Sequence, residues 1–335
     1  MARFIARRLA YMVITLLLVS IVAFAIIQLP PGDFLTSELA RLQEQGQSVD
    51  MSQIAALKER YGLDQPAYVQ YWKWISGIVL HGDFGQSFEL NRPVSQLIGD
   101  RLPLTVTLGL ATLLFSWAIS LPAGMYAAVR RYSVGDYAIN IVSFLGMAIP
   151  GFLLALTFSY LSFRYFGQSV GGLFSPQYAD AQWNMGKVLN LLSHLWLPVL
   201  VIGIEGTAGT IRITRANLLD ELAKSYVVTA RSKGLSERRL ILKYPVRIAL
   251  NPFFSTVGWV LPGLVNGEVI VAQVLGLQTT GPLLLEALKS QDMYLAGGII
   301  LVIAGLTIVG TLCSDILLAI VDPRIRLNMT SRAGE

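Results

Sequence analysis

The chain has 335 residues, of which 54% are hydrophobic and 14% are charged, and its mean hydropathy is positive. This composition lies outside the usual range of soluble domains of this length and indicates a protein whose solvent is a lipid bilayer. The formal net charge is +5, and the single cysteine excludes a disulfide within the chain.

The N-terminal segment begins with basic residues and continues as an apolar run to Leu29. About 20 apolar residues suffice to cross a hydrocarbon core of roughly 30 Å. A cleaved signal peptide has a shorter core and a small-residue cleavage site, whereas this run ends in the residues Pro-Pro-Gly-Asp at 30–33. We therefore expect residues 1–29 to form an uncleaved first transmembrane helix.

Six segments of the chain are apolar and long enough to cross a membrane as helices. Closed β-barrels also satisfy every backbone amide in lipid, but they need strands of alternating polarity, which this sequence lacks. The predicted fold is an all-α membrane protein with six transmembrane helices. The expected spans are residues 9–29, 102–129, 137–164, 191–211, 251–275 and 296–320.

Lysine and arginine gather at the N-terminus, in the turn near residue 130, in residues 212–247 and in the C-terminal tail. Short loops rich in these residues face the cytoplasm, so both termini are expected there. Residues 30–100 then form an extracytoplasmic loop region. Within it, the aromatic segment AYVQYWKWISGIVL at 67–80 predicts a helix at the membrane–water interface.

The usual chemical motifs are missing from the sequence. The two histidines, His81 and His194, are far apart, and no cysteine pair or HExxH motif is present, so no metal site is expected. Residues 276–281 have the glycine spacing of a phosphate-binding loop, but Pro282 and Leu283 follow where lysine and serine or threonine are needed. We expect no catalytic residues and no cofactor in this chain.

Two carboxylates within the predicted spans are candidates for a translocation pathway, Glu205 and Glu268. Facing lipid near the membrane centre would cost each of them roughly 2.5 kcal/mol or more. Each is therefore expected to face protein or a water-filled path, and for Glu268 a hydrogen-bonded packing role stays open.

Residues 212–247 hold nine lysines and arginines against three acids. Placing nine cations in lipid would cost roughly 20–30 kcal/mol, so this segment is expected in the cytoplasm. Apolar residues recur at helical spacing over 218–232, and Gly234 is placed for a left-handed helix cap. Ser236 can cap a second helix, which Pro245 ends or bends. This basic hairpin could dock on anionic lipid or on a protein partner, and its pattern alone leaves both open.

The string TARSKGLSERRLILKYPVRIALNP, residues 229–252, resembles the cytoplasmic "EAA" loop of ABC-importer permeases, in the form found in the dipeptide, oligopeptide and nickel group. The similarity runs along nearly the whole chain. Further matching strings lie at residues 7–9, 31–33, 61–66, 70–71, 82–87, 101–105, 214–215 and 322–326.

The resemblance implies a multi-pass permease of the bacterial inner membrane. A binding protein would deliver the substrate from outside, and ATP hydrolysis in partner subunits would drive transport. The implied partners are a homologous second permease, two ATP-binding subunits, the extracytoplasmic binding protein and membrane lipid, without nucleic acid. The hairpin would be the coupling helix that fits a cleft on an ATP-binding subunit. The coupling residues implied are Tyr226, Ala230, Arg231, Lys233, Gly234, Leu235 and Arg239.

The resemblance also implies a division into a first helix (1–29), the outer loop region (30–100), a permease domain (101–322) with its coupling loop at 212–250, and a cytoplasmic tail (323–335).

The sequence departs from the family pattern in its fifth span and in the turn that follows. The family's acid in that span aligns with Ala272, whereas Glu268 stands four residues earlier. The turn at 278–282 is similar to permeases associated with oligosaccharide uptake. Peptides and solutes of similar size, such as oligosaccharides, both stay open as substrates, and nickel is not excluded.

Two other functions compete with an ABC permease. A secondary transporter or channel would need no ATPase, but the inverted repeats typical of such transporters are not visible. An intramembrane enzyme would need a nucleophile and a base at matching depth, and the acids within the spans do not supply them.

Overall fold

The computed structural model describes residues 2–28, 65–87, 89–167, 171–179, 181–266 and 269–321. These residues form helices without a β-strand, which confirms the all-α class. The chain divides into two compact units. One comprises Met1–Leu104 with Thr279–Ile308, and the other comprises Thr105–Gln278 with Val309–Glu335.

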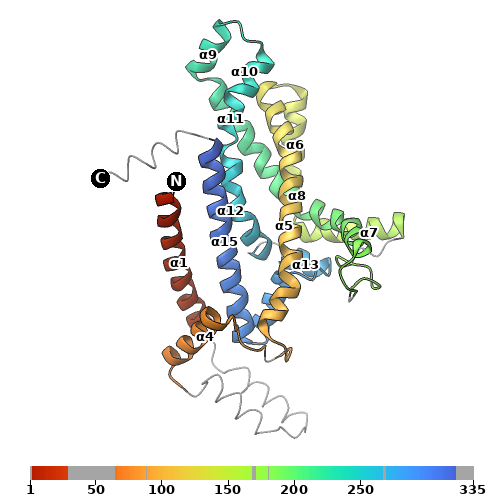
Figure 1. Cartoon of the computed structure of the whole chain (residues 1–335). Coiled ribbons are helices and arrows are strands. Elements are labelled where there is room, and N and C mark those ends of the chain that lie inside the picture. The colour runs from red at the N-terminus through yellow and green to blue at the C-terminus, as the bar shows by residue number, and fades with distance from the viewer. Residues whose placement is uncertain are drawn as a thin grey trace. The chain divides into compact units, whose positions relative to one another are not determined.

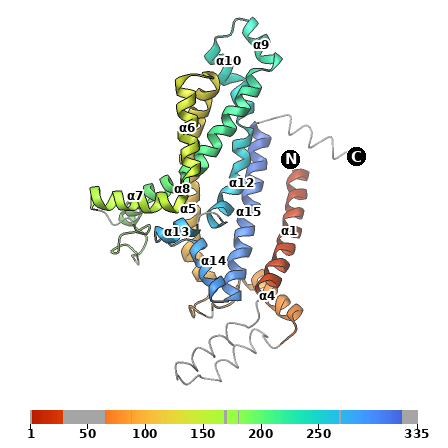
Figure 2. The same ribbon diagram turned by 180° about the vertical axis from the view of Figure 1, so that it is seen from behind.

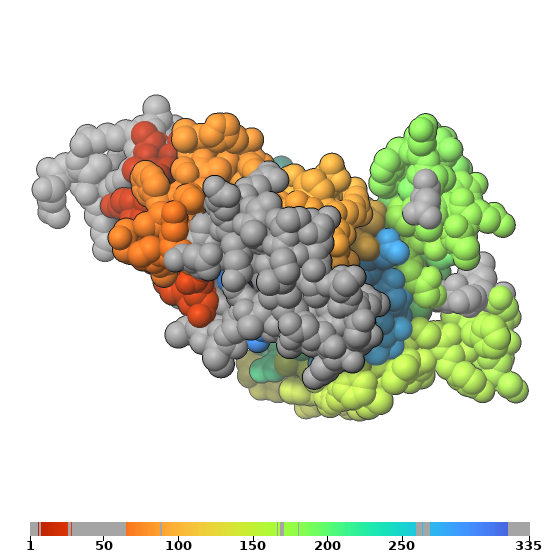
Figure 3. All heavy atoms as spheres, turned by 90° about the horizontal axis from the view of Figure 1, so that it is seen from below, coloured from red at the N-terminus to blue at the C-terminus, as the bar shows by residue number. Residues whose placement is uncertain are grey.

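In the first unit, the aromatic helix α4 packs against the N-terminal helix α1. The Phe24 ring of α1 lies 5.5 Å from the ring of Tyr71 and 5.8 Å from that of Trp74. Figure 3 shows α4 in orange against α1 in red. The predicted helix at 67–80 is confirmed, and part of its aromatic set faces protein. The helices of this unit are α1 (Ala2–Gln28), α4 (Ala67–His81), the start of α5 (Val94–Val129), α14 (Thr280–Lys289) and the start of α15 (Met293–Val321).

Asp292 fixes the beginning of α15. Its side chain is fully buried, accepts a hydrogen bond of 2.6 Å from the Ser87 hydroxyl and accepts another of 3.1 Å from the backbone N–H of Leu295. The second bond caps the first turn of the helix. Gly85 lies close by at φ +91°, where a Cβ would stand 2.9 Å from the Tyr294 ring. Glycine is required at position 85, because both the backbone conformation and the close contact disfavour a side chain there.

In the second unit, α8 packs against α5, α6, α7 and α11. At Gly124 of α5, a Cβ would lie only 2.6 Å from the Cβ of Thr214, so glycine permits the close approach of α5 to α8. The helices of this unit, besides the rest of α5 and α15, are α6 (Val134–Ala148), α7 (Gly151–Phe166), α8 (Met185–Leu222), α9 (Ser225–Ser232), α10 (Glu237–Lys243), α11 (Pro245–Ala249), α12 (Asn251–Asn266) and α13 (Val269–Val274).

Four helical stretches of the described residues are long and apolar enough to cross a membrane, or five if a bent pair counts as one span. They overlap the predicted spans at 9–29, 102–129, 191–211 and 296–320. The four stretches are Arg8–Ala25, Val94–Val129, Met185–Leu222 and Met293–Ile320.

The predicted span at 137–164 is not one straight helix. It consists of α6 and α7, which meet at an angle of 98° (Figure 2). The break falls at Ile149, whose ψ of 121° is extended, directly before Pro150. A proline disfavours the helical conformation in the residue before it and lacks the N–H that would continue the helix.

The predicted span at 251–275 is described as two helices, and residues 267–268 between them lie outside the described part of the chain. α12 ends at Asn266 and α13 begins at Val269, so neither helix reaches the length of a crossing by itself. Six spanning helices are therefore not confirmed within the described part of the chain.

Candidate functional site

The basic segment 212–247 begins in the last turns of α8 and continues into α9, α10 and α11, and these three helices form the hairpin at the C-terminal end of α8 (Figure 1). The helix predicted over 218–232 is in fact two helices, because α8 ends at Leu222 and α9 starts at Ser225. Leu218 belongs to a cluster with α5 and α11, whereas Val227 belongs to a cluster with α10. One straight helix could not place Leu218 in the first cluster and Val227 in the second. The turn at 223–224 changes the direction of the chain between them.

The corner of the hairpin has the predicted backbone. Gly234 follows α9 at φ +76°, and its N–H donates to the carbonyl of Arg231 over 3.0 Å. Ser236 occupies the N-cap position of α10 but makes no capping bond with its side chain. Pro245 opens α11 after α10 has ended, as expected for a residue that suits the first turn of a helix.

A small core holds the hairpin together. Val227 and Leu240 are fully buried, and Ala230 is buried beside them. Tyr226 and Leu235, two of the residues implied for coupling, pack around this core. Tyr226, Ala230 and Leu235 therefore shape the hairpin from inside.

The other residues implied for coupling face outward. Arg231, Lys233, Gly234 and Arg239 are all exposed. Arg231 forms a two-bonded ion pair with Glu237 across the corner. The hydrogen bonds from Arg231 also hold the pKa of the Glu237 carboxyl below its ordinary value.

The outer surface of the hairpin carries unbalanced positive charge. All seven lysines and arginines between 224 and 247 are exposed. Among the residues that the structure describes, Lys233, Arg238 and Arg239 form no ion pair. A folded surface with several unpaired cations is suited to an acidic partner surface.

The remaining two of the nine cations lie on α8. Arg215 makes two hydrogen bonds to Asp136, of 2.7 and 2.8 Å, at the N-terminal end of α6. The Asp136 side chain is only 2% exposed and also accepts bonds from the Tyr132 backbone and the Asn140 amide. The ion pair between Arg215 and Asp136 was not predicted from the sequence. The pattern Ser133-x-x-Asp136, which is typical of a capped helix start, was the only sequence signal at this position.

Of the two residues predicted for the translocation pathway, the structure describes Glu205 but not Glu268. Glu205 is exposed on α8 and makes no hydrogen bond or ion pair within the described residues. Glu268 lies outside the described residues. The structure does not bring the coupling residues and Glu205 into one site, because they occupy different parts of the second unit.

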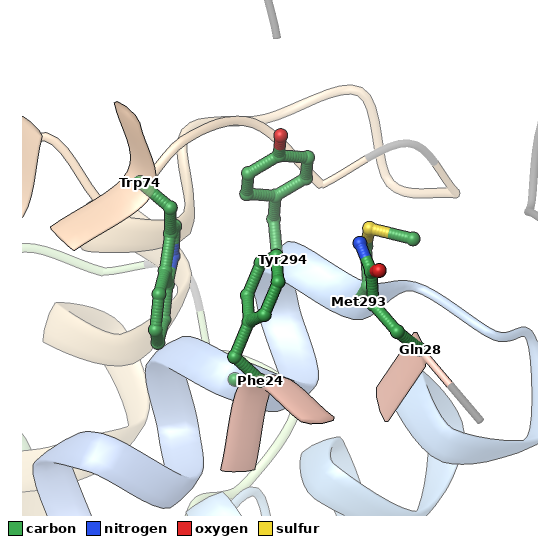
Figure 4. A pocket seen from close by; sticks show the side chains of 6 residues that line it. Phe24, Gln28, Trp74, Met293 and Tyr294 are labelled. Atoms are coloured by element: carbon green, nitrogen blue, oxygen red, sulfur yellow. The ribbon is translucent and has the colours of Figure 1, made fainter. Parts of the chain in front are cut away.

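The described residues also enclose cavities, two of which differ in size and lining. The first, between α1, α4 and α15, is lined by Phe24, Trp74 and Tyr294 among others and has a volume of about 10 Å³ (Figure 4). That volume is room for about one water molecule. The second measures about 370 Å³ and lies between α5, α6 and α8, with a largely apolar lining that includes Phe115, Val142 and Ile204. No charged residue lines the second cavity.

The sequence matches one family of transport proteins along most of its length. Residues 120–327 match the family described as "Binding-protein-dependent transport system inner membrane component", and residues 1–109 match the N-terminal region of such components. Among similar proteins, the oligopeptide transport system permease protein AppB of Bacillus subtilis is 36% identical over 327 residues, covering 97% of this chain and 99% of that protein.

Two further relatives show the same extent of similarity. A putative peptide permease protein of Brucella ovis is 32% identical over 329 residues, covering 98% of this chain and 100% of that protein. The oligopeptide transport system permease protein OppB of Haemophilus influenzae is 31% identical over 327 residues, covering 97% and 100%. The chain therefore belongs to the binding-protein-dependent transport system inner membrane components, and it is a permease subunit of an ABC importer rather than an enzyme.

Proposed function

We propose that this permease forms half of a translocation pathway for peptides and that the basic hairpin, within residues 212–250, transmits the motion of an ATP-binding subunit. The observation that carries this proposal is the exposed, unpaired positive charge on a hairpin that has its own small core. A rigid, charged projection can be gripped by a partner with a complementary acidic cleft.

The contacts of α8 support a mechanical role for the hairpin. α8 has 38 residues and is therefore about 57 Å long. Leu218 near its end packs with Val246 and Ala249 of α11, and Arg215 is joined to Asp136 of α6. A displacement of the hairpin would be passed to α8 and α6 together, because these contacts tie the three parts into one body.

The proposed topology has six spans, at the positions expected from the sequence, with both termini and the hairpin in the cytoplasm. The basic residues near 130 and in 224–247 support this orientation. Residues 30–100 would meet the extracytoplasmic binding protein. A homologous second permease would complete the pathway, and each permease would engage one of two ATP-binding subunits.

The names of the similar proteins support peptides as the transported class. The oligosaccharide alternative rests on one turn at 278–282 and has no support among these relatives. In such importers the binding protein does most of the selection, so the permease need only accept what it is given.

The test of coupling is the substitution Gly234→Leu. A Cβ at Gly234 meets no atom of this chain within 4 Å, so the side chain would project into the space that the partner is proposed to occupy. We expect ATP-driven peptide uptake by the assembled transporter to be abolished, while the amount of inserted permease stays at the wild-type level.

Gly167→Leu is the matched control. Gly167 has φ +64° and an equally open surrounding, so the backbone strain of the two substitutions is alike, yet it ends α7 and is remote from the hairpin in sequence. Uptake by this control should persist. Wild-type uptake by Gly234→Leu, or equal loss in both variants, would contradict coupling through the hairpin.

A further inference from the structure

The exposed residues of α8 lie on different sides of its two halves, and they differ in chemical character. In the half nearer Met185, the exposed residues include Leu189, Leu192 and Trp196. In the half nearer Leu222, they include Glu205 and Arg212. Glu205 stands nine positions after Trp196, which is two and a half turns, so the two exposed stripes lie on opposite sides of the helix.

The two stripes suit different surroundings. Leucine and tryptophan are the ordinary residues of a lipid-facing surface. Glu205 lies within the span expected at 191–211 and should face protein or water, because exposure of a carboxylate to lipid is costly, and Arg212 directly follows that span. The second stripe is also open between its charges, since a Cβ at Gly206 or Gly209 would meet no atom within 4 Å.

Both charges on this second stripe are available to a ligand. Glu205 has no hydrogen-bonding or ionic partner among the described residues. Within the described residues, the recorded contacts of Arg212 are with neutral groups of α6: its guanidinium carbon lies 5.4 Å from the centre of the Phe144 ring, and Nη1 lies 3.7 Å from the sulfur of Met147. These contacts orient the guanidinium and leave its charge uncompensated.

The positions of the two residues along α8 indicate the length of the ligand. Glu205 and Arg212 are seven positions apart, so they lie on one face of the helix and their backbones are about 10.5 Å apart along its axis. An extended peptide rises by about 3.3–3.6 Å per residue, and three residues therefore span about 10–11 Å. We propose that Glu205 and Arg212 form a subsite in the translocation pathway for short zwitterionic peptides, in which Glu205 binds the terminal ammonium and Arg212 binds the terminal carboxylate.

This inference rests on the proposed function and narrows its substrate class. A neutral oligosaccharide has no charged ends and would leave both side chains unpaired, whereas a peptide with free ends pairs each of them. The small residues between the charges leave room for the peptide backbone to lie along the helix.

The test is the binding of trialanine to the assembled transporter in lipid nanodiscs, without its binding protein, measured by calorimetry. In the wild type, acetylating the amino end or amidating the carboxyl end should each weaken binding about tenfold, because each removes one charge-assisted contact. In Glu205→Gln, acetylation should lose its effect while amidation keeps it. In Arg212→Gln, the pattern should be reversed.

Asp220→Asn is the control variant, since Asp220 is exposed on the same stripe near the end of α8 and lies beyond the proposed subsite. It should keep the wild-type response to both blocked peptides. Equal responses of all variants to each blocked peptide, or no binding of trialanine to the wild type, would overturn the subsite. Dissociation of the two permeases in Glu205→Gln would also overturn it, because it would assign the face to subunit contact.

ATP-driven trialanine uptake, measured with the binding protein on the same preparations, separates the two proposals. Uptake that persists while blocked ends make no difference refutes the subsite and leaves the proposed function intact. Absence of peptide uptake in the wild type refutes both.

Discussion

Asp136 shows how one residue can hold two helices in register. Its carboxylate is almost fully buried and accepts from Arg215 of α8, from the backbone of Tyr132 and from the Asn140 amide. An intact buried ion pair contributes little to folding stability. Removing one partner lowers the stability strongly, because the other charge stays buried and uncompensated.

We predict that Asp136→Asn lowers the unfolding free energy by about 3–5 kcal/mol. The reason is that Arg215, whose side chain is only 24% exposed, would lose the carboxylate that balances its charge. The measurement is the thermal unfolding of the purified chain in detergent.

The control is the surface pair of Arg92 and Asp100, whose side chains are 50% and 60% exposed. Asp100→Asn removes a similar contact of 2.9 Å from a solvated site and should cost less than about 1 kcal/mol. Equal effects of the two substitutions would show that the Asp136 pair has no special role.

At the scale of elements, the division of one predicted span into α6 and α7 has the clearest consequence. Hydropathy alone joins the two helices into one span, because both are apolar and only Ile149 and Pro150 stand between them. Pro150 was present in the sequence, but a proline within a span can also kink it slightly. The angle of 98° depends on where the two halves find packing partners.

Spin labels at Tyr137 and Tyr160 provide the corresponding prediction. Both residues are exposed, and they lie in α6 and α7, on opposite sides of the break. A straight helix would separate their backbones by about 35 Å, whereas the bend reduces this to about 23 Å. Double electron–electron resonance on a Cys313→Ser background should give the shorter distance. A distance near the longer value would contradict the bend between α6 and α7.

The hairpin is the element in which local signals were most informative. Gly234, Ser236 and Pro245 all stand at the helix ends predicted from the sequence. The turn at 223–224 was not predicted, because it contains no glycine or proline that would indicate the end of a helix. It exists because Leu218 and Val227 belong to different clusters, which is a property of the folded chain.

At the scale of the whole molecule, the testable property is which parts share one side of the membrane. We predict that Lys233 and Val134 face the cytoplasm and that Tyr68 faces outward, because short basic segments are retained inside. Single cysteines at these exposed positions, on the Cys313→Ser background, can be labelled with a membrane-impermeant maleimide.

In intact spheroplasts, the reagent should modify Tyr68→Cys alone, and the other two positions should react only after the membrane is broken. Labelling of Lys233→Cys in intact spheroplasts would place the hairpin outside and would contradict its coupling to an ATP-binding subunit.

The sequence by itself determined that the protein lies in a lipid bilayer, that its fold is helical and that it carries a basic hairpin. These follow from composition, from apolar length and from the high cost of placing cations in lipid, none of which depends on contacts between distant residues. It also located the glycine corner at Gly234, because turn chemistry is local.

Only the tertiary structure decided the bend between α6 and α7, the pairing of Asp136 with Arg215 and the side of α8 on which Glu205 lies. Asp136 and Arg215 are 79 positions apart, so no local pattern connects them. Which face of a helix is left free depends on every helix packed against it, and in a chain that is apolar on most sides hydropathy cannot distinguish those faces.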